Sequence, residues 1–158
     1  MIKEFIAVAT LGLAGAGFAQ APTSVTSGKA LYPHAQALAD GVVQRNPDML
    51  DVILHVSPTP EAKNIVIAAH LKAANGEASG DDDLGVAKTG APLVEVQKDG
   101  VRLGILVQLR DASHRPIGAV GLMYPYKQGD DVEAAVRRSF AIRDALATRI
   151  PSRAALVG

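Results

Sequence analysis

Two histidines, His55 and His70, are the side chains of this chain best suited to binding chemistry. They lie in two neighbouring runs of β-branched residues, 51–56 and 64–70, and strand alternation predicts that both rings are on one side of a strand pair. Two imidazoles on one face could donate hydrogen bonds to an anionic ligand, or hold a metal ion together with Asp82. Each ring could equally bond to a loop carbonyl and have a structural role only.

Three successive aspartates, Asp81–Asp83, stand in a long connection between predicted strands. An aspartate before a helix accepts hydrogen bonds from the first backbone N–H groups, so Asp81 is expected to cap a short helix that runs through Lys88 and ends at Gly90. Contact with a cationic ligand is the functional alternative. Calcium binding is disfavoured because the alternating Asp-x-Asp-x-Asp-Gly pattern of calcium loops is missing.

Four further side chains are candidates for ligand contact. Lys88 and Arg110 could anchor a carboxylate, since the planar guanidinium fork suits that group, or could simply belong to a solvated face. Tyr124 and Tyr126 share one side of the last predicted strand and could wall a pocket, or could pack beneath the long connection. The predicted ligand-binding set is therefore His55, His70, Lys88, Arg110, Tyr124 and Tyr126.

Catalytic motifs are missing from the sequence. It contains no Gly-x-Ser-x-Gly elbow, no His-Glu-x-x-His zinc motif, and no phosphate or dinucleotide loop. The absence of cysteine excludes disulfides, thiolate metal sites and a cysteine nucleophile. We therefore expect a binding protein rather than an enzyme, and no cofactor is predicted.

The composition limits the class of partner. Sixteen basic and sixteen acidic residues give a formal net charge of zero, which argues against the basic face that a nucleic-acid partner requires. The charged residues also form no polybasic patch for a membrane surface. A length of 158 residues with 48% hydrophobic content is typical of one domain with a sizeable core.

The N-terminus has the features of a secretion signal over residues 1–19. Lys3 supplies a positive start, an apolar stretch rich in Ala and Gly follows, and the small residues around Phe18 predict cleavage after Ala19. Residues 20–30 are expected to be a flexible leader. The expected location is thus periplasmic or secreted, with a domain over residues 31–151 and a tail over 152–158.

Hydrophobic periodicity predicts terminal helices around a set of strands. The first helix covers 33–45, and the last begins after Asp130 and ends before Pro151. Asp99-Gly100 is a two-residue hairpin signal of the type I′ kind. The predicted strands are 51–56, 64–70, 93–98, 101–110 and 117–124.

This order of elements predicts an α+β fold. It is a five-stranded antiparallel sheet with the N- and C-terminal helices on one face, and the connection 71–91 is what remains to cover the other face. A hollow is then expected between that connection and the sheet, with His55 and His70 at its wall.

Two segments and the order of the elements resemble extracellular Cache/PAS-like sensor domains in their single-module form. Residues 83–92, from Asp83-Leu84 to Lys-Thr-Gly-Ala-Pro at 88–92, are similar to the family's helix and entry into the third strand. Residues 109–113, followed by Ile-Gly-Ala-Val-Gly at 117–121, are similar to its hairpin. The resemblance implies a pocket for a small organic acid, amino acid or amine. It also allows a homodimer and a separate membrane sensor or transporter as partner, while no anchor or transmitter segment is found in the sequence.

Three other functions remain open at this point. A metal- or haem-binding periplasmic protein would use His55 and His70. A small hydrolase or isomerase would need a histidine buried beside a carboxylate. An interaction module would show a large exposed apolar patch.

Overall fold

The computed structural model describes residues 29–158, which form four helices and one five-stranded sheet. The predicted signal peptide, and the predicted leader up to residue 28, lie outside the described residues. No helix between residues 29 and 158 combines the length and apolar character needed to cross a bilayer. The helices are α1 (Pro33–Arg45), α2 (Asp81–Thr89), α3 (Val132–Ala147) and α4 (Arg153–Val157). The strands are β1 (Asp51–Val56), β2 (Ile65–Ala69), β3 (Leu93–Val96), β4 (Arg102–Arg110) and β5 (Pro116–Pro125).

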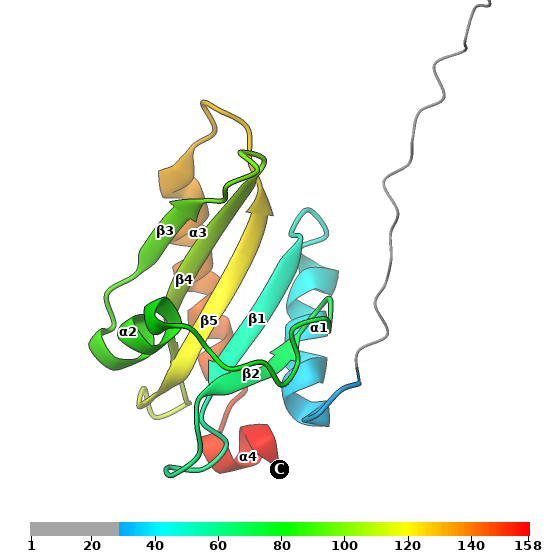
Figure 1. The fold of residues 1–158 in the computed structure, drawn as a ribbon, viewed down its shortest axis with the longest axis vertical. Coiled ribbons are helices and arrows are strands. Elements are labelled where there is room, and N and C mark those ends of the chain that lie inside the picture. The colour runs from blue at the N-terminus through cyan, green and yellow to red at the C-terminus, as the bar shows by residue number, and fades with distance from the viewer. Residues whose placement is uncertain (1–28) are drawn as a thin grey trace, which may run out of the picture.

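The sheet has the order β2-β1-β5-β4-β3, and every neighbouring pair is antiparallel. The strands β1–β2 and β3–β4–β5 are local hairpins, and the last strand returns to lie beside the first. Figure 1 shows this open sheet with helices on both sides. The predicted α+β class and the five antiparallel strands are confirmed.

One face of the sheet holds the main core. Strand alternation sends one set of aliphatic residues to this face, where α1 and α3 cover them, behind the sheet in Figure 1. The N- and C-terminal helices therefore share a face, as predicted. The core residues include Leu38, Val42, Val52, Leu54, Ile105, Val107, Val120, Leu122, Ile142 and Leu146.

The C-terminal segment belongs to the domain. Pro151 does follow the end of α3, but the chain then forms α4, whose N-cap Ser152 accepts a hydrogen bond from the N–H of Ala155. Leu156 is completely buried in the main core. The predicted boundary at residue 151 is therefore wrong, because an apolar contact beyond it anchors residues 152–158.

The helix α2 covers part of the opposite face. Its buried Val86 packs against Leu106 and Ala119 in a small second core. The helix starts one residue earlier than the predicted capping implies: Gly80 is the N-cap, and its N–H donates to the Asp83 carboxylate at 2.8 Å. Gly90 ends the helix in the left-handed conformation, with φ 77°. The connection 71–91 thus covers the second face, as expected.

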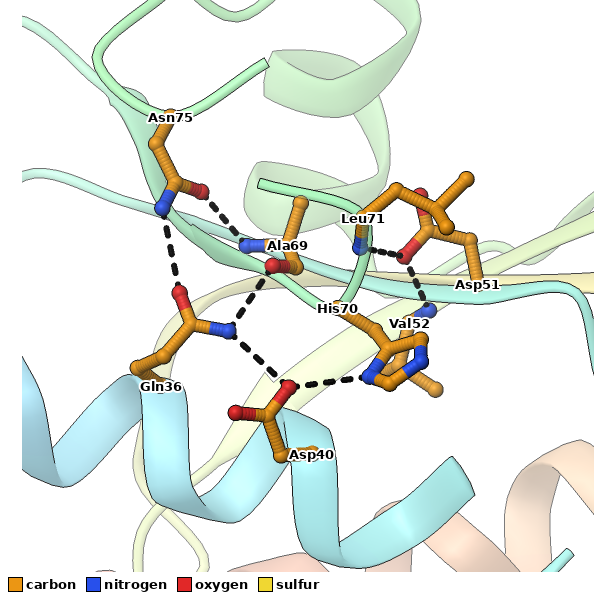
Figure 2. A network of polar contacts seen from close by, with 8 residues as sticks. All are labelled: Gln36, Asp40, Asp51, Val52, Ala69, His70, Leu71 and Asn75. Atoms are coloured by element: carbon orange, nitrogen blue, oxygen red, sulfur yellow. Dashed lines mark hydrogen bonds and ion pairs between the residues drawn. The ribbon is translucent and has the colours of Figure 1, made fainter. Parts of the chain in front are cut away.

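A polar network fixes the first part of that connection to α1 (Figure 2). The buried Gln36 donates to the carbonyl of Ala69 at 2.9 Å and accepts from Asn75 at 3.0 Å. Asn75 in turn accepts from the N–H of Ala69 at 2.7 Å. These bonds satisfy the buried amide of Gln36, so α1 helps to hold the turn after β2, together with the turn's own hydrogen bonds.

Candidate functional site

A cavity of about 260 Å³ lies between the second face of the sheet, the first turn of α2 and the edge strand β3. Its floor is formed by side chains that alternate along the three central strands, and its walls by Asp82 and Asp83 of α2 and by the β3 segment. The lining residues are Ile53, His55, Asp82, Asp83, Leu93, Glu95, Gln97, Gly104, Ile105, Leu106, Gly121, Leu122 and Met123.

Two glycines leave the space open. Gly104 on β4 pairs with Met123, and Gly121 on β5 pairs with Leu106, so both lie on the floor. A Cβ added at Gly121 would have no neighbour nearer than 3.6 Å and would reach within 3.8 Å of Nε2 of His55. Side chains at these positions would therefore project into the cavity and reduce its volume.

His55 is the buried polar group of the floor, with 8% of its surface exposed. Its Nδ1 lies 3.0 Å from Oγ of Ser79 and 3.3 Å from the Asp83 carboxylate. The Ser79 hydroxyl donates to Oδ1 of Asn64 at 2.6 Å, so it can only accept from the imidazole. Both neighbours of Nδ1 are then acceptors, and this nitrogen carries the ring proton.

The other nitrogen of His55 faces the cavity. Burial lowers the pKa of the His55 imidazole below its ordinary value of 6.5, and the Asp83 carboxylate opposes this shift only in part. The ring is therefore neutral near pH 7. Among residues 29–158, no polar group bonds to Nε2, which lies beside Gly121. It presents a lone pair to the cavity and can accept one hydrogen bond.

The charged groups that line the cavity are acidic. Asp82, Asp83 and Glu95 contribute carboxylates, whereas no lysine or arginine is among the lining residues. Arg102 shares the floor side of β4 but is bonded to the Asp99 carboxylate in the adjacent turn. The cavity therefore combines an apolar floor with a rim that is negative and rich in hydrogen-bond acceptors.

His70 does not reach this cavity. It lies just beyond the end of β2 and bonds through Nδ1 to the Asp40 carboxylate of α1 at 2.9 Å, on the opposite face of the sheet (Figure 2). A register shift in the β1–β2 pair between Leu54 and His55 breaks the alternation on which the prediction depended. The predicted pairing of both imidazoles at one wall is therefore wrong.

The separation of the histidines also removes the metal or haem site that used both rings. His55 could still approach Asp82, but His70 could not complete that set. Within residues 29–158, no group of three or more His, Cys, Asp or Glu side chains is arranged to hold a metal ion.

Neither predicted carboxylate anchor lines the cavity. Lys88 is exposed near the end of α2, and Arg110 ends β4, where its Nε donates to Oε1 of Gln108 at 3.1 Å. Gln108 also donates to the carbonyl of Ala87. Arg110 is thus directed to the junction of β4 with the end of α2, away from the carboxylates at the start of that helix.

The two tyrosines lie on the helix side of the sheet. Tyr124 is buried, and its hydroxyl is 2.9 Å from Oγ of Ser139 on α3. The guanidinium of Arg138 lies 5.5 Å from the centre of the Tyr124 ring. Tyr126 packs partly against the same core. The strand parity was read correctly, but it places both rings in the core rather than in the cavity.

Several cavity residues were not predicted. Glu95 and Gln97 look like ordinary exposed strand residues in the sequence, and Met123 looks like core. The sequence signal that could have indicated the cavity is the pair Gly104 and Gly121. A glycine inside a strand marks a place where another backbone or a ligand comes close, or where no side chain fills the space. Both lie on the side of their strands that is not continuously aliphatic.

The chain matches no protein-family model and no curated protein. Among solved structures, a protein described as a GAF sensor from Burkholderia vietnamiensis is 17% identical over 82% of this chain and 83% of its own, with a TM-score of 0.51. The DcuS sensor domain of E. coli is 19% identical over 66% of this chain and 71% of its own, with a TM-score of 0.42. A type II free methionine-R-sulfoxide reductase from Thermoplasma acidophilum is 18% identical over 74% of this chain and 91% of its own, with a TM-score of 0.45. The first likeness and the strand order define the fold as PAS/GAF-like.

Proposed function

We propose that this chain is a small-molecule sensing domain that binds its ligand in the cavity between the sheet and α2. The observation that carries the proposal is the cavity itself: an apolar floor opened by Gly104 and Gly121, with the buried imidazole of His55 directed into it. The PAS/GAF-like fold is compatible with this role, but a fold alone does not define a function, so the proposal depends on the site.

The construction of the cavity supports a binding role over a packing defect. Burying an ionisable ring is costly unless its hydrogen bonds are satisfied, and here Ser79, Asn64 and Asp83 form a shell that fixes the orientation of His55. A polar group held in position by neighbouring hydrogen bonds is what a binding site requires. An alanine would fit at position 121, so the open floor is not enforced by steric crowding.

The proposal includes export and a sensor role of the Cache type. The predicted signal over residues 1–19 would deliver the domain to the periplasm or exterior, and a separate membrane sensor or transporter would read its state. Mass spectrometry of the protein from a periplasmic fraction tests the first part: a mature N-terminus at Gln20 is expected, and an intact Met1 would contradict it.

The proposal also excludes turnover of the ligand. His55 is buried beside the Asp83 carboxylate, but its Nδ1 proton is shared between two structural acceptors. The chain has no cysteine to act as a thiol nucleophile. Recovery of an unchanged ligand after prolonged incubation is expected, and conversion of the ligand to a product would contradict this part of the proposal.

A thermal-shift screen tests the binding function. A ligand that binds the folded state raises the unfolding midpoint by mass action, so we expect at least one class of amines, amino acids, organic acids or neutral solutes to raise it. Gly121→Ala should keep the fold, since its new methyl group meets only ordinary contacts, and should abolish that shift.

Gly85→Ala is the matched control. Gly85 lies on α2, where an added Cβ would meet nothing within 4 Å, so this variant should keep the ligand shift. The proposal fails if no class shifts the unmodified protein, or if Gly121→Ala binds as well as the unmodified protein does.

A further inference from the structure

From the charges and hydrogen-bonding groups of the cavity, we infer that its ligand is a small organic cation: an amine with a short apolar body. This inference rests on the proposed function and specifies the ligand class of the same site. It narrows the range of organic acids, amino acids and amines that the sequence left open.

The first argument is the charge of the lining. Asp82, Asp83 and Glu95 bring three carboxylates to the walls, and no lysine or arginine of residues 29–158 lines the cavity. The two arginines on this face of β4 do not line the cavity: Arg102 is bonded to Asp99, and Arg110 lies at the other end of the strand. A ligand carboxylate would meet like charges, whereas an ammonium group would be attracted.

The second argument is the balance of donors and acceptors. An ammonium group has up to three N–H donors and no acceptor. The cavity offers it the lone pair of Nε2 of His55 and the carboxylates of Asp82 and Glu95. The Asp83 carboxylate is already used by the N–H of Gly80 and by Nδ1 of His55. The free polar groups of the cavity are thus mostly acceptors, which complement a donor-rich ligand.

The elements of the fold separate the polar and apolar parts of the site. Glu95 lies on β3 opposite Gly104, and Asp82 lies in the first turn of α2, so both acids are on the walls. The floor between them is aliphatic, with Ile53, Leu106 and Met123. A volume of about 260 Å³ is below the ~300–1,000 Å³ typical of drug-sized sites. The ligand therefore has room for a short chain or one ring.

The test compares probes that share a carbon skeleton and differ in the polar group. We would titrate the full chain with n-butylamine and 2-phenylethylamine, and with the carboxylate and the alcohol of each skeleton, by calorimetry and thermal shift. The amines are expected to bind at least tenfold more tightly than either partner. Equal or tighter binding of a carboxylate or an alcohol would overturn the inference.

A charge-removing variant tests the acidic wall. Glu95→Gln keeps the side-chain size on an exposed strand and should weaken amine binding about fivefold, as expected for a partly solvated ion pair. Glu77→Gln, at an exposed position that does not line the cavity, is the matched control and should leave binding unchanged. Unchanged amine affinity in Glu95→Gln would also overturn the inference.

Failure of this inference is distinguishable from failure of the proposed function. If a carboxylate or alcohol binds best and Gly121→Ala abolishes its binding, the cavity is a ligand site and only the cationic class is wrong. If Gly121→Ala leaves the binding of every probe unchanged, the cavity is not the site and both proposals fail.

Discussion

His55 lies where the floor of the sheet meets the start of α2, and its two nitrogens have different neighbours. Nδ1 faces two acceptors, Ser79 and Asp83, whereas Nε2 faces the cavity beside Gly121. Because burial lowers the pKa of this imidazole, the folded domain keeps the ring neutral at pH values where an exposed histidine is already partly protonated. The protonation state of a group that lines the cavity therefore depends on the pH of the solution.

The lowered pKa of His55 predicts a loss of stability on acidification. Below about pH 6.5 the unfolded chain binds a proton at this histidine before the folded chain does, so the free energy of unfolding decreases as the pH falls towards the lower folded pKa. His55→Asn keeps an N–H donor but cannot titrate, and should lose this part of the pH dependence. Urea unfolding between pH 5 and 7.5 measures it.

The control for this experiment is His114→Asn, because His114 is exposed in a turn. That variant leaves His55 and its neighbours in place, so it should keep the part of the pH dependence that is assigned to His55. Equal pH slopes for His55→Asn and the unmodified protein would show that His55 does not resist protonation in the folded state.

At the scale of single residues, the sequence placed both His55 and His70 at the cavity wall, and the structure places only His55 there. His55 sits inside a strand, where alternation is reliable, whereas His70 lies past a strand end and after a register shift. The glycines show a second limit. A Cβ on Gly118 would overlap the carbonyl oxygen of His55, whereas Gly121 has room for one. Both belong to the same Ile-Gly-Ala-Val-Gly run, and only the partner strand reveals which one opens the cavity.

The turn after β2 shows how one element is positioned by another. Asn75 joins this turn to Gln36 of α1 and to the backbone of Ala69, and His70 adds a contact to Asp40 (Figure 2). The sequence predicted a long connection with one short helix after Asp81, and it gave no structure for the part before that helix. The bonds that join this turn to Gln36 and Asp40 connect residues 39 and 30 positions apart, so they could not be read from local patterns.

We expect Asn75→Ala to destabilise the domain by about 1–2 kcal/mol. The change leaves the N–H of Ala69 and the Gln36 carbonyl without their partners at a partly buried position. Chemical denaturation measures the loss. Glu77→Ala, an exposed change in the same connection, is the control and should stay within about 0.5 kcal/mol. Equal stabilities for the two variants would mean that the network does not hold the turn.

Sequence periodicity and turn residues predicted the first helix and strand well, but they predicted the wrong type of turn at Asp99-Gly100. The first helix and the strand 51–56 agree with α1 and β1. The hairpin at Asp99-Gly100 differs from the predicted type I′ turn, because only Gly100 has positive φ, 71°, and its N–H donates to the carbonyl of Gln97. The longer loop shortens β3 to Leu93–Val96 and places Gln97 at the cavity. Loop type could not be derived from the dipeptide alone.

At the scale of the whole molecule, the short C-terminal helix α4 completes the main core with a buried side chain. Leu156 of α4 is fully buried, and α4 contacts α1 at the other end of the chain. The sequence ended the domain at Pro151 because a proline is a common helix stop. A five-residue helix is too short to show periodicity, so its packing was visible only in three dimensions.

Leu156→Ala should therefore destabilise the domain by about 2–5 kcal/mol, as expected when a buried leucine leaves a cavity. Leu71→Ala makes the same substitution at a side chain that is 51% exposed, and should change stability by about 0.5 kcal/mol or less. Urea unfolding of both variants gives the comparison. If Leu156→Ala destabilises the protein no more than Leu71→Ala does, residues 152–158 do not contribute to the stability of the domain.

The fold class was predictable for two reasons. Antiparallel strands show alternating apolar residues and short turns in the sequence. The two long amphipathic helices each have an apolar side that must pack against a face of the sheet. The cavity was predictable in position but not in lining. Its walls come from β3 and α2, and the side chains that they bring together depend on where these elements begin and end. The helix α2 starts one residue earlier than expected, and β3 ends two residues earlier.

The edge strand β3 has a paired neighbour on one side only, and all four of its residues are exposed. Local opening is easiest where few buried contacts and solvent-exposed backbone bonds coincide, so its amides should exchange with deuterium sooner than those of the central β1 and β5. A ligand bound between Glu95 and the cavity floor would contact both β3 and the central strands. Ligand binding would then slow the deuterium exchange of the β3 amides, without any rearrangement of the rest of the domain.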